Sequence, residues 1–464
     1  MEFITLGHTD QIGASCHLLK AEETGILLDT GVHPDIDGPE GLPRFDVLRN
    51  RPDLFVDHIV MSHAHHDHLG ALPVALQRFP HAVVHFTKPT RELAEFLLRA
   101  SARLQRRRIR EGSSTAEPLF SEEELEYYSY LYLAHDLETP FSVAGVRGGA
   151  PVRATFYHAG HVLGSAGTLF EFEEAGVPKR VFFTGDILLR PQVLTPAADL
   201  PDAPIDVLIM EATLGADTGA EETTRKAEEE RFAEHIGRTL AGGGAVLVPV
   251  FALGRAQEML TLIGRLKERG VIPPTTPVYT AGSMRAIAEI YDKTRLTSPR
   301  LDPEIQIFGI DQKRLPRGEN ALVAALREPS IFVLPSGMMF ERTMSNEVAQ
   351  YLVDQEKNAV LLVGFAKPGS PSDLLLQAAK EPGTEVVIDK MTGPQPVWCS
   401  VERFRFSGHS HRRDLLGMVT KLRPKKVVLV HGEPAAKEWM RDNILHFHPE
   451  IEVFLPETGV PLVL

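Results

Sequence analysis

With 464 residues, the chain is long enough for two or three domains, or for one domain with a large insertion, and its 43% of hydrophobic residues can build a sizeable core. The 49 lysines and arginines stand against 62 acidic residues. The resulting formal net charge of −13 argues against nonspecific binding of duplex DNA, which needs a basic surface. Two cysteines are too few for a disulfide framework, no apolar stretch approaches about 18 residues, and the first residues lack the pattern of a signal peptide, so we expect a soluble cytoplasmic protein.

Short strands joined by tight turns are predicted for residues 1–60. Apolar runs of strand length occupy residues 3–6, 17–19 and 25–28, and glycine-containing turns separate them. The third run ends at Asp29. The side chain of Asp29 can simply hold the turn by a hydrogen bond, or it can brace a metal-binding loop from behind, and both interpretations stay open.

The next predicted strand comprises residues 56–60, and the segment directly after it contains four potential metal ligands. His63 and His65 point the same way if the chain is extended there, because side chains alternate along a strand. Asp67 and His68 come off the turn two and three residues later and can aim at a neighbouring point. A single tetrahedral ion with an open position needs fewer ligands than this chain offers. Two ions about 3.5–4 Å apart can instead stabilise both the attacking and the leaving group of a displacement reaction. The spacing therefore indicates two metal ions side by side.

A helical region with a basic run is predicted for residues 89–137. Residues 91–98 are amphipathic. The basic run that follows consists of Arg99, Arg103, Arg106, Arg107, Arg108 and Arg110. Such a run can contact a phosphate backbone, but it is more often a solvated helix face, and both interpretations stay open. Ser121, followed by three glutamates, predicts the start of a second helix.

Two further ligand candidates follow predicted strands. His161 comes shortly after the strand at 152–157 and lies near two glycines, where the backbone can turn sharply and approach a ligand. Asp186 comes just past the apolar strand at 180–183, where a carboxylate is unfavourable unless it is solvated, paired or ligating. Each alone is a weak signal. Together with residues 63–68, they supply a third histidine and a bridging carboxylate.

An α/β domain is predicted for residues 211–395. Apolar strands at 245–250 and 331–334 alternate with helical segments, and this alternation predicts a largely parallel sheet. Residues 1–210 and 396–464 are then expected to form the other domain.

The C-terminal stretch completes the set of metal ligands. A wholly apolar strand at 427–430 delivers His431, and a short strand is predicted at 404–406. Mixed imidazole and carboxylate ligands suit Zn²⁺, with Mn²⁺ or iron as alternatives. The two predicted ligand shells share Asp186 and consist of His63, His65 and His161 around one ion and of Asp67, His68 and His431 around the other.

Three more side chains are candidates for acid–base chemistry and phosphate contacts. His409 can protonate a leaving oxygen. Glu211 can orient His409 and stabilise its positive charge. Ser407, two residues before His409, can hydrogen-bond a phosphate oxygen, as can His409 itself. Alternatively, each of these three side chains has only a structural role and forms its hydrogen bonds within the fold. Asp67 is a catalytic candidate as well as a ligand.

These motifs make the chain similar to the metallo-β-lactamase-fold nucleases of the β-CASP group. The matching segments follow the family's order and span nearly the whole chain: residues 28–31, 63–68, 160–166, 184–186, 211–213, 249–258, 336–338, 406–409 and 430–433. The resemblance implies an αββα sandwich with an inserted α/β cap domain and an active site in the cleft between the two. Glu211, His409 and His431 match the group's three additional motifs.

The resemblance also implies a substrate. In the family, histidine at the place of His431 goes with RNA-processing members, and valine goes with DNA-repair members. The chain therefore resembles relatives of the mRNA 3′-end cleavage factor, and the implied activity is hydrolysis of RNA phosphodiester bonds by a hydroxide that two Zn²⁺ ions activate. We expect RNA as the partner and no membrane, and a homodimer stays open.

Two departures from the family pattern put the substrate preference in question. Ser410-His411 replaces the usual Ala-Asp, and residues 369–373 replace a Gly-Thr-rich turn. The alternatives are a catalytically inactive RNA-processing scaffold and a metallo-hydrolase of DNA or small molecules on the same fold.

Overall fold

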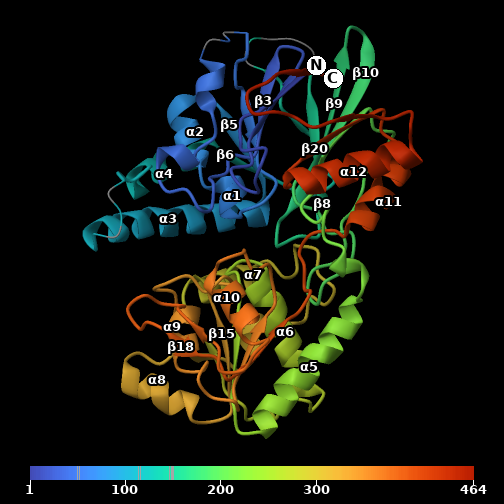
Figure 1. Ribbon diagram of the computed structural model, residues 1–464. Helices are drawn as coiled ribbons and strands as arrows, with labels where there is room; N and C mark the ends of the chain where they lie inside the picture. The colour runs from blue at the N-terminus through green and yellow to red at the C-terminus, as the bar shows by residue number, and fades with distance from the viewer. Residues whose placement is uncertain (50, 52, 113, 115, 146, 148–150) are drawn as a thin grey trace. The chain divides into compact units, whose positions relative to one another are not determined.

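The computed structural model describes residues 1–464 apart from 50, 52, 113, 115, 146 and 148–150, and it divides into two compact units (Figure 1). Unit 1 comprises Met1–Arg190, Ala197–Asp217 and His409–Leu464, and unit 2 comprises Pro191–Pro196 and Thr218–Gly408. Most of unit 2 is therefore inserted into the chain of unit 1. The domain boundaries predicted at 210/211 and 395/396 stay predictions.

The first sheet of unit 1 is built largely from the short apolar runs near the N-terminus. Its strand order is β22-β1-β2-β3-β4-β5-β6. The strands are β1 (Glu2–Thr5), β2 (His17–Ala21), β3 (Thr24–Leu28), β4 (His58–Val60), β5 (Val83–Thr87), β6 (Tyr132–His135) and β22 (Leu462–Val463). Strands β1 to β3 pair antiparallel, and β3 to β6 pair parallel. The strands predicted at 3–6, 17–19 and 25–28 are confirmed within a residue or two.

The second sheet of unit 1 has the order β21-β20-β11-β10-β9-β8-β7. Its strands are β7 (Phe141–Ser142), β8 (Arg153–His158), β9 (Ala166–Glu174), β10 (Val177–Phe183), β11 (Val207–Glu211), β20 (Lys426–Val430) and β21 (Glu452–Phe454). Strands β10, β11 and β20 run parallel, so their carboxyl ends meet at one edge of the sheet. Asp186, Glu211 and His431 lie at or just past these ends.

The two sheets pack face to face, with helices on the outer faces, and this αββα sandwich confirms the predicted fold class. Along β10, Val181 and Phe183 point into the core between the sheets, whereas Phe182 points into the core under the outer helices, as the alternation of side chains requires. Helix α3 (Lys88–Arg110) packs on β5 and β6, and α12 (Pro434–Phe447) packs on β20 beside α11 (Arg412–Leu422) (Figure 1).

Unit 2 contains a parallel sheet with the order β14-β13-β15-β12-β16-β19. Its strands are β12 (Ala245–Pro249), β13 (Val278–Thr280), β14 (Lys313–Arg314), β15 (Ser330–Leu334), β16 (Ala359–Leu362) and β19 (Ser400–Arg403). Helices α6 (Arg255–Glu268) and α7 (Ser283–Lys293) connect strands of this sheet, and α5 (Arg225–Ala241) precedes β12 (Figure 1). The parallel sheet and the strands predicted at 245–250 and 331–334 are confirmed.

The strand predicted at residues 404–406 is wrong. Strand β19 ends at Arg403, and only the backbone N–H of Phe404 continues toward β16, where it donates to the carbonyl of Leu362 at 2.8 Å. The backbone N–H of Arg405 donates instead to a side-chain carboxylate oxygen of Glu228 at 2.7 Å. A side chain has therefore replaced a neighbouring strand as the acceptor.

Helix α3 carries the basic run, and most of its arginines that were singled out find acidic partners. Arg103 and Arg106 both form ion pairs with Glu122. Arg107 pairs with Glu111, and Arg108 pairs with Asp37. These pairs favour a solvated, charge-balanced helix face over a phosphate-binding one. Across the described ranges of the chain, no helix combines the length and the apolar character that a membrane span requires.

Asp206 fastens the start of β11 to both neighbouring strands. Its carboxylate accepts a hydrogen bond from the backbone N–H of Arg180 at 2.9 Å and another from Nζ of Lys425 at 2.7 Å. Burial raises the pKa of this carboxyl, but the bonds from Lys425 and Arg180 outweigh burial, and the net effect is a lowered pKa.

We predict that Asp206→Asn lowers the free energy of unfolding by about 1 kcal/mol near neutral pH, because a charge-assisted hydrogen bond is lost. A carboxyl with a lowered folded pKa stabilises the fold above its unfolded pKa, and this stabilisation disappears as the pH falls through the folded pKa. Urea unfolding of both proteins at about pH 7 and about pH 2.5 measures the difference. A deficit of the same size at both pH values would contradict the assignment.

Candidate metal centre

Asp29, at the end of β3, holds the loop after β4 from behind. Its carboxylate accepts hydrogen bonds from the backbone N–H and the hydroxyl of Ser62, both at 2.7 Å, and faces Nδ1 of His68 at 2.8 Å. The backbone of Asp29 has a φ of 58°, in the left-handed region that strains a residue with a Cβ. These contacts favour the bracing interpretation of Asp29.

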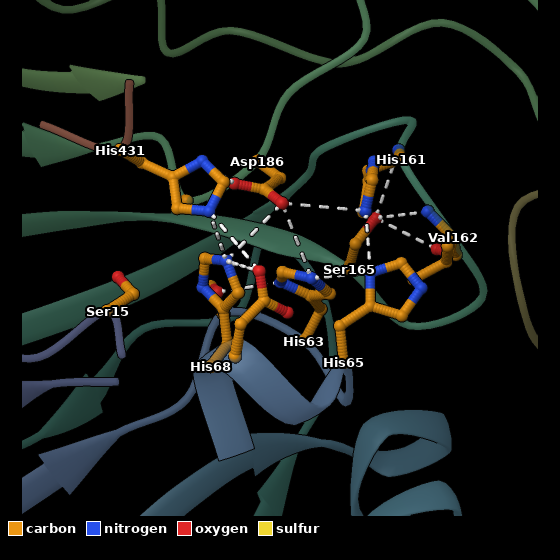
Figure 2. Close-up of polar contacts among 12 residues, drawn as sticks. Ser15, His63, His65, His68, His161, Val162, Ser165, Asp186 and His431 are labelled. Carbon is orange, nitrogen blue, oxygen red and sulfur yellow. Dashed lines mark hydrogen bonds and ion pairs between the residues drawn. The ribbon is translucent and has the colours of Figure 1, made fainter. Parts of the chain in front are cut away.

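The first ligand cluster consists of His63, His65, His161 and Asp186 (Figure 2). Nδ1 of His65 lies 3.1 Å from Nε2 of His63 and 3.0 Å from Nε2 of His161. Oδ2 of Asp186 lies 3.6 Å from each of these two Nε2 atoms. Because His63 and His161 are buried, the rings are held by packing and converge on one point.

The second cluster consists of Asp67, His68 and His431. The short helix α1 (His66–Leu69) carries the first two, and His431 follows β20. Nε2 of His68 lies 3.2 Å from Nε2 of His431, which in turn lies 3.4 Å from Oδ2 of Asp67. Since Nδ1 of His68 donates to the carboxylate of Asp29, Nε2 is the ring nitrogen that is directed into the cluster.

Asp186 lies between the two clusters (Figure 2). Its Oδ2 is 3.4 Å from Nε2 of His68 as well as near the first cluster, and its Oδ1 is 3.3 Å from Nδ1 of His431. Among the described residues, nothing donates a hydrogen bond to the buried Oδ1. A buried carboxylate oxygen without a donor is unfavourable, and a cation would compensate it.

The arrangement of the nitrogens fits metal ligation. Nδ1 of His65 has two imidazole nitrogens at hydrogen-bond distance, but it holds either one lone pair or one proton, so it can satisfy only one of them. Two nitrogens that bind one tetrahedral zinc ion are about 3.3 Å apart, close to the spacing seen here. The donor set therefore fits a divalent metal better than a hydrogen-bonded network.

The charges in the two clusters favour a cation as well. The pKa of Asp186 is well below its usual value, because the imidazoles of His431 and His68 outweigh the opposing effect of burial. The pKa of His68 is well above its usual value, because Asp186 and Asp67 outweigh burial. A proton on His68 therefore compensates the two carboxylates, and a bound cation could take its place.

His409 and Glu211 form a separate pair beside Asp186. Nδ1 of His409 lies 3.0 Å from Oε2 of Glu211 and 4.0 Å from Oδ2 of Asp186. Glu211 is fully buried, and its Oε1 accepts the backbone N–H of Ile187 at 2.7 Å. Burial lowers the pKa of His409, but Glu211 and Asp186 outweigh it and raise the pKa to about 9.

The remaining candidate, Ser407, lies in unit 2, and its phosphate contact stays a prediction. Two groups that position ligands were not among the residues predicted from the sequence. Oγ1 of Thr213 lies 3.0 Å from Nδ1 of His431, and Oγ of Ser165 accepts the backbone N–H groups of His161 and Val162. Both residues stand in quoted motifs, and their small hydroxyl side chains next to proposed ligands were the available signal.

Models of three protein families match the chain in succession. The metallo-beta-lactamase superfamily matches residues 9–227, and the Beta-Casp domain matches residues 256–375. The family described as "Zn-dependent metallo-hydrolase RNA specificity domain" matches residues 394–456.

Several curated proteins are similar over most of the chain. Endoribonuclease YSH1 from Eremothecium gossypii is 30% identical over 446 residues, which are 93% of this chain and 55% of that protein. Endoribonuclease ysh1 from Schizosaccharomyces pombe is 29% identical and covers 100% of this chain and 59% of its own length. The chain thus spans little more than half the length of these relatives. An RNase J-like protein from Methanocaldococcus jannaschii is 29% identical over 92% of this chain and 91% of its own.

Among solved structures, a protein of unknown function from Enterococcus faecalis V583 matches 100% of the chain with a TM-score of 0.57 and 15% identity, which shows the fold alone. The ligand clusters at the strand ends, the αββα sandwich and the three successive domain matches agree with one another. The chain belongs to the metallo-β-lactamase superfamily, in the group that carries a β-CASP domain.

Proposed function

We propose that the chain is a metal-dependent nuclease that hydrolyses phosphodiester bonds in RNA. The observation that carries the proposal is the pair of ligand clusters that share Asp186. The match to an RNA specificity domain and the similarity to the endoribonuclease relatives support RNA as the substrate and cleavage within the strand. His431, at the position where the sequence analysis expected histidine in RNA-processing members, agrees with this choice.

The donor set supports two zinc ions as the cofactor. His63, His65 and His161 would hold one ion, and the second cluster would hold the other, with Asp186 shared between them. Bound zinc ions would lower the pKa of a water toward neutrality and compensate the negative charge that develops on the phosphate. Among the chain's own groups, Asp29 orients His68 by accepting a hydrogen bond from its Nδ1–H, and Thr213 lies at hydrogen-bond distance from Nδ1 of His431.

His409 is the proposed general acid. With its pKa raised to about 9, the imidazole carries a proton near neutral pH and can deliver it to the departing oxygen. Glu211 accepts a hydrogen bond from Nδ1–H of His409, so the proton to be delivered is the one on Nε2. Glu211 therefore sets both the protonation state and the orientation of the acid.

We predict that Asp67→Ala and His68→Ala each reduce cleavage of labelled RNA more than about 100-fold, since each removes a proposed ligand. His446→Ala, an exposed histidine on α12, is the matched control and should cleave like the wild type. Circular dichroism checks that the fold survives. Undiminished cleavage by either ligand variant would reject the proposed site, and an inactive wild type with bound metal would favour the scaffold alternative.

Asp29→Ala should weaken zinc binding about 10–100-fold, because His68 loses the acceptor that fixes its tautomer. Competition with a chelating dye measures the affinity, and metal analysis of the wild type should find about two zinc ions per chain. The control Asp37→Ala removes an exposed carboxylate that pairs with Arg108. Equal affinities in the two variants would show that Asp29 does not support the ligand.

The pH profile should report His409. Since its pKa is raised, the acid form is present below about pH 9 and is lost above it, so kcat should fall as the pH rises through that value. Glu211→Gln removes the largest influence that raises this pKa and should move the fall in kcat to lower pH. A profile whose alkaline side is unchanged by Glu211→Gln would rule out His409 as the acid.

A further inference from the structure

Arg255 of unit 2 is a partly buried cation, and its Nη1 atom has no acceptor among the described residues. It is the first residue of α6, in the GRAQE stretch that follows β12. Its Nη1 atom is buried, and among the described residues nothing accepts a hydrogen bond from it. A buried guanidinium donor without an acceptor costs free energy, so its presence calls for an explanation.

The surroundings of Arg255 make the charge still less favourable. A cation is disfavoured at the amino-terminal end of a helix, where the helix dipole is positive. Burial, together with the positive charge of Arg225, lowers the pKa of Arg255 to about 9. The helix dipole and the positive charge of Arg225, which both disfavour a cation here, would favour a bound anion.

The nearby carboxylate of Glu258 is already occupied. Its Oε2 accepts the backbone N–H groups of Val193 and Leu194 at 2.7 and 2.9 Å. Its Oε1 accepts the backbone N–H and the hydroxyl of Thr195 at 3.0 and 2.8 Å. Glu258 therefore holds the 193–195 segment and has little capacity left to accept from an arginine.

Arg225, the first residue of α5, also has an unused donor at this place. Its Nη2 is buried without a hydrogen-bond partner among the described residues and lies 3.9 Å from Oε2 of Glu258, beyond hydrogen-bond distance. Its guanidinium stacks over the ring of Phe406 at 5.1 Å. Phe406 directly precedes Ser407 in the sequence, the residue predicted to contact a substrate phosphate.

We propose that Arg255 and Arg225 form a binding site for a phosphate group of the RNA substrate. Guanidinium groups present forked N–H donors that match phosphate oxygens, and two unused donors beside one saturated carboxylate are suited to an anion. The identity of the anion as an RNA phosphate rests on the proposed function. Arg300 in the same region differs in that both of its Nη atoms donate to carbonyl oxygens, those of Ile305 and Tyr291, although its buried Nε has no partner among the described residues.

The first test uses inorganic phosphate and needs no nuclease activity. Thermal unfolding of the wild type, Arg255→Gln and Arg269→Gln is followed in phosphate and in sodium chloride of equal ionic strength. Arg269 follows the last residue of the same helix, so its variant has the same change of charge away from the site. Phosphate should raise the Tm of the wild type and of Arg269→Gln by about 2 °C more than that of Arg255→Gln.

The second test measures binding of single-stranded RNA in an Asp67→Ala background, where cleavage is blocked. Arg255→Gln should weaken binding about tenfold and reduce the slope of log K against log salt by about 0.7, the loss of one phosphate contact. Arg255→Lys keeps the charge without the fork, so it should keep the slope and bind with intermediate affinity.

The outcomes separate the two proposals. If Arg255→Gln and Arg269→Gln respond alike to phosphate, the anion site is rejected whatever the chain's activity. If only the phosphate response differs and RNA binding is equal, the site takes a free phosphate, and its assignment to RNA is overturned. A wild type that does not cleave RNA but shows the phosphate difference would overturn the proposed function and retain the anion site.

Discussion

The buried carboxylate of Asp186 is surrounded by imidazoles that come from three separate stretches of the chain, and the rest of unit 1 is arranged to make this possible. Burial of a charge is tolerated only where opposite charge or ligation compensates it. The compensation comes from His63, His68 and His161, each within 3.6 Å, and from His431 on the other oxygen. Because β10, β11 and β20 run parallel, their ends bring Asp186, Glu211 and His431 to one edge without long loops.

A second layer of contacts aims the ligands. Asp29 fixes the tautomer of His68, and Thr213 lies at hydrogen-bond distance from Nδ1 of His431. Asp29 and His431 both have left-handed backbones, with φ values of 58° and 44°. Side chains with a Cβ are strained there, so the surrounding hydrogen bonds must hold them in place. Strain concentrated at the residues that brace or supply ligands is what a preorganised site requires.

In unit 2, the charge that lacks full compensation is positive. Strand β12 of its parallel sheet ends shortly before α6. The first residue of α6 is Arg255, whose Nη1 has no hydrogen-bond acceptor among the described residues. Glu258, one turn later, is taken up by the backbone of residues 193–195. In unit 1 a surplus of acceptors calls for cations, and in unit 2 a surplus of donors calls for an anion. The first surplus suits metal ions, and the second suits a phosphate group.

The amino-acid sequence by itself determined the short apolar strands, the parallel sheet of unit 2 and the set of ligand candidates. Strand periodicity and the spacing of His63, His65, Asp67 and His68 are local properties, and few residue types can bind metal. Only the tertiary structure decided that Asp29 braces His68, that acidic residues pair with much of the basic run on α3, and that residues 404–406 do not form a strand. Arg255 belongs with these cases, because the lack of an acceptor depends on every residue that packs around it. Contacts between residues far apart in the chain leave no trace in local periodicity or composition, and for that reason they had to be read from the fold.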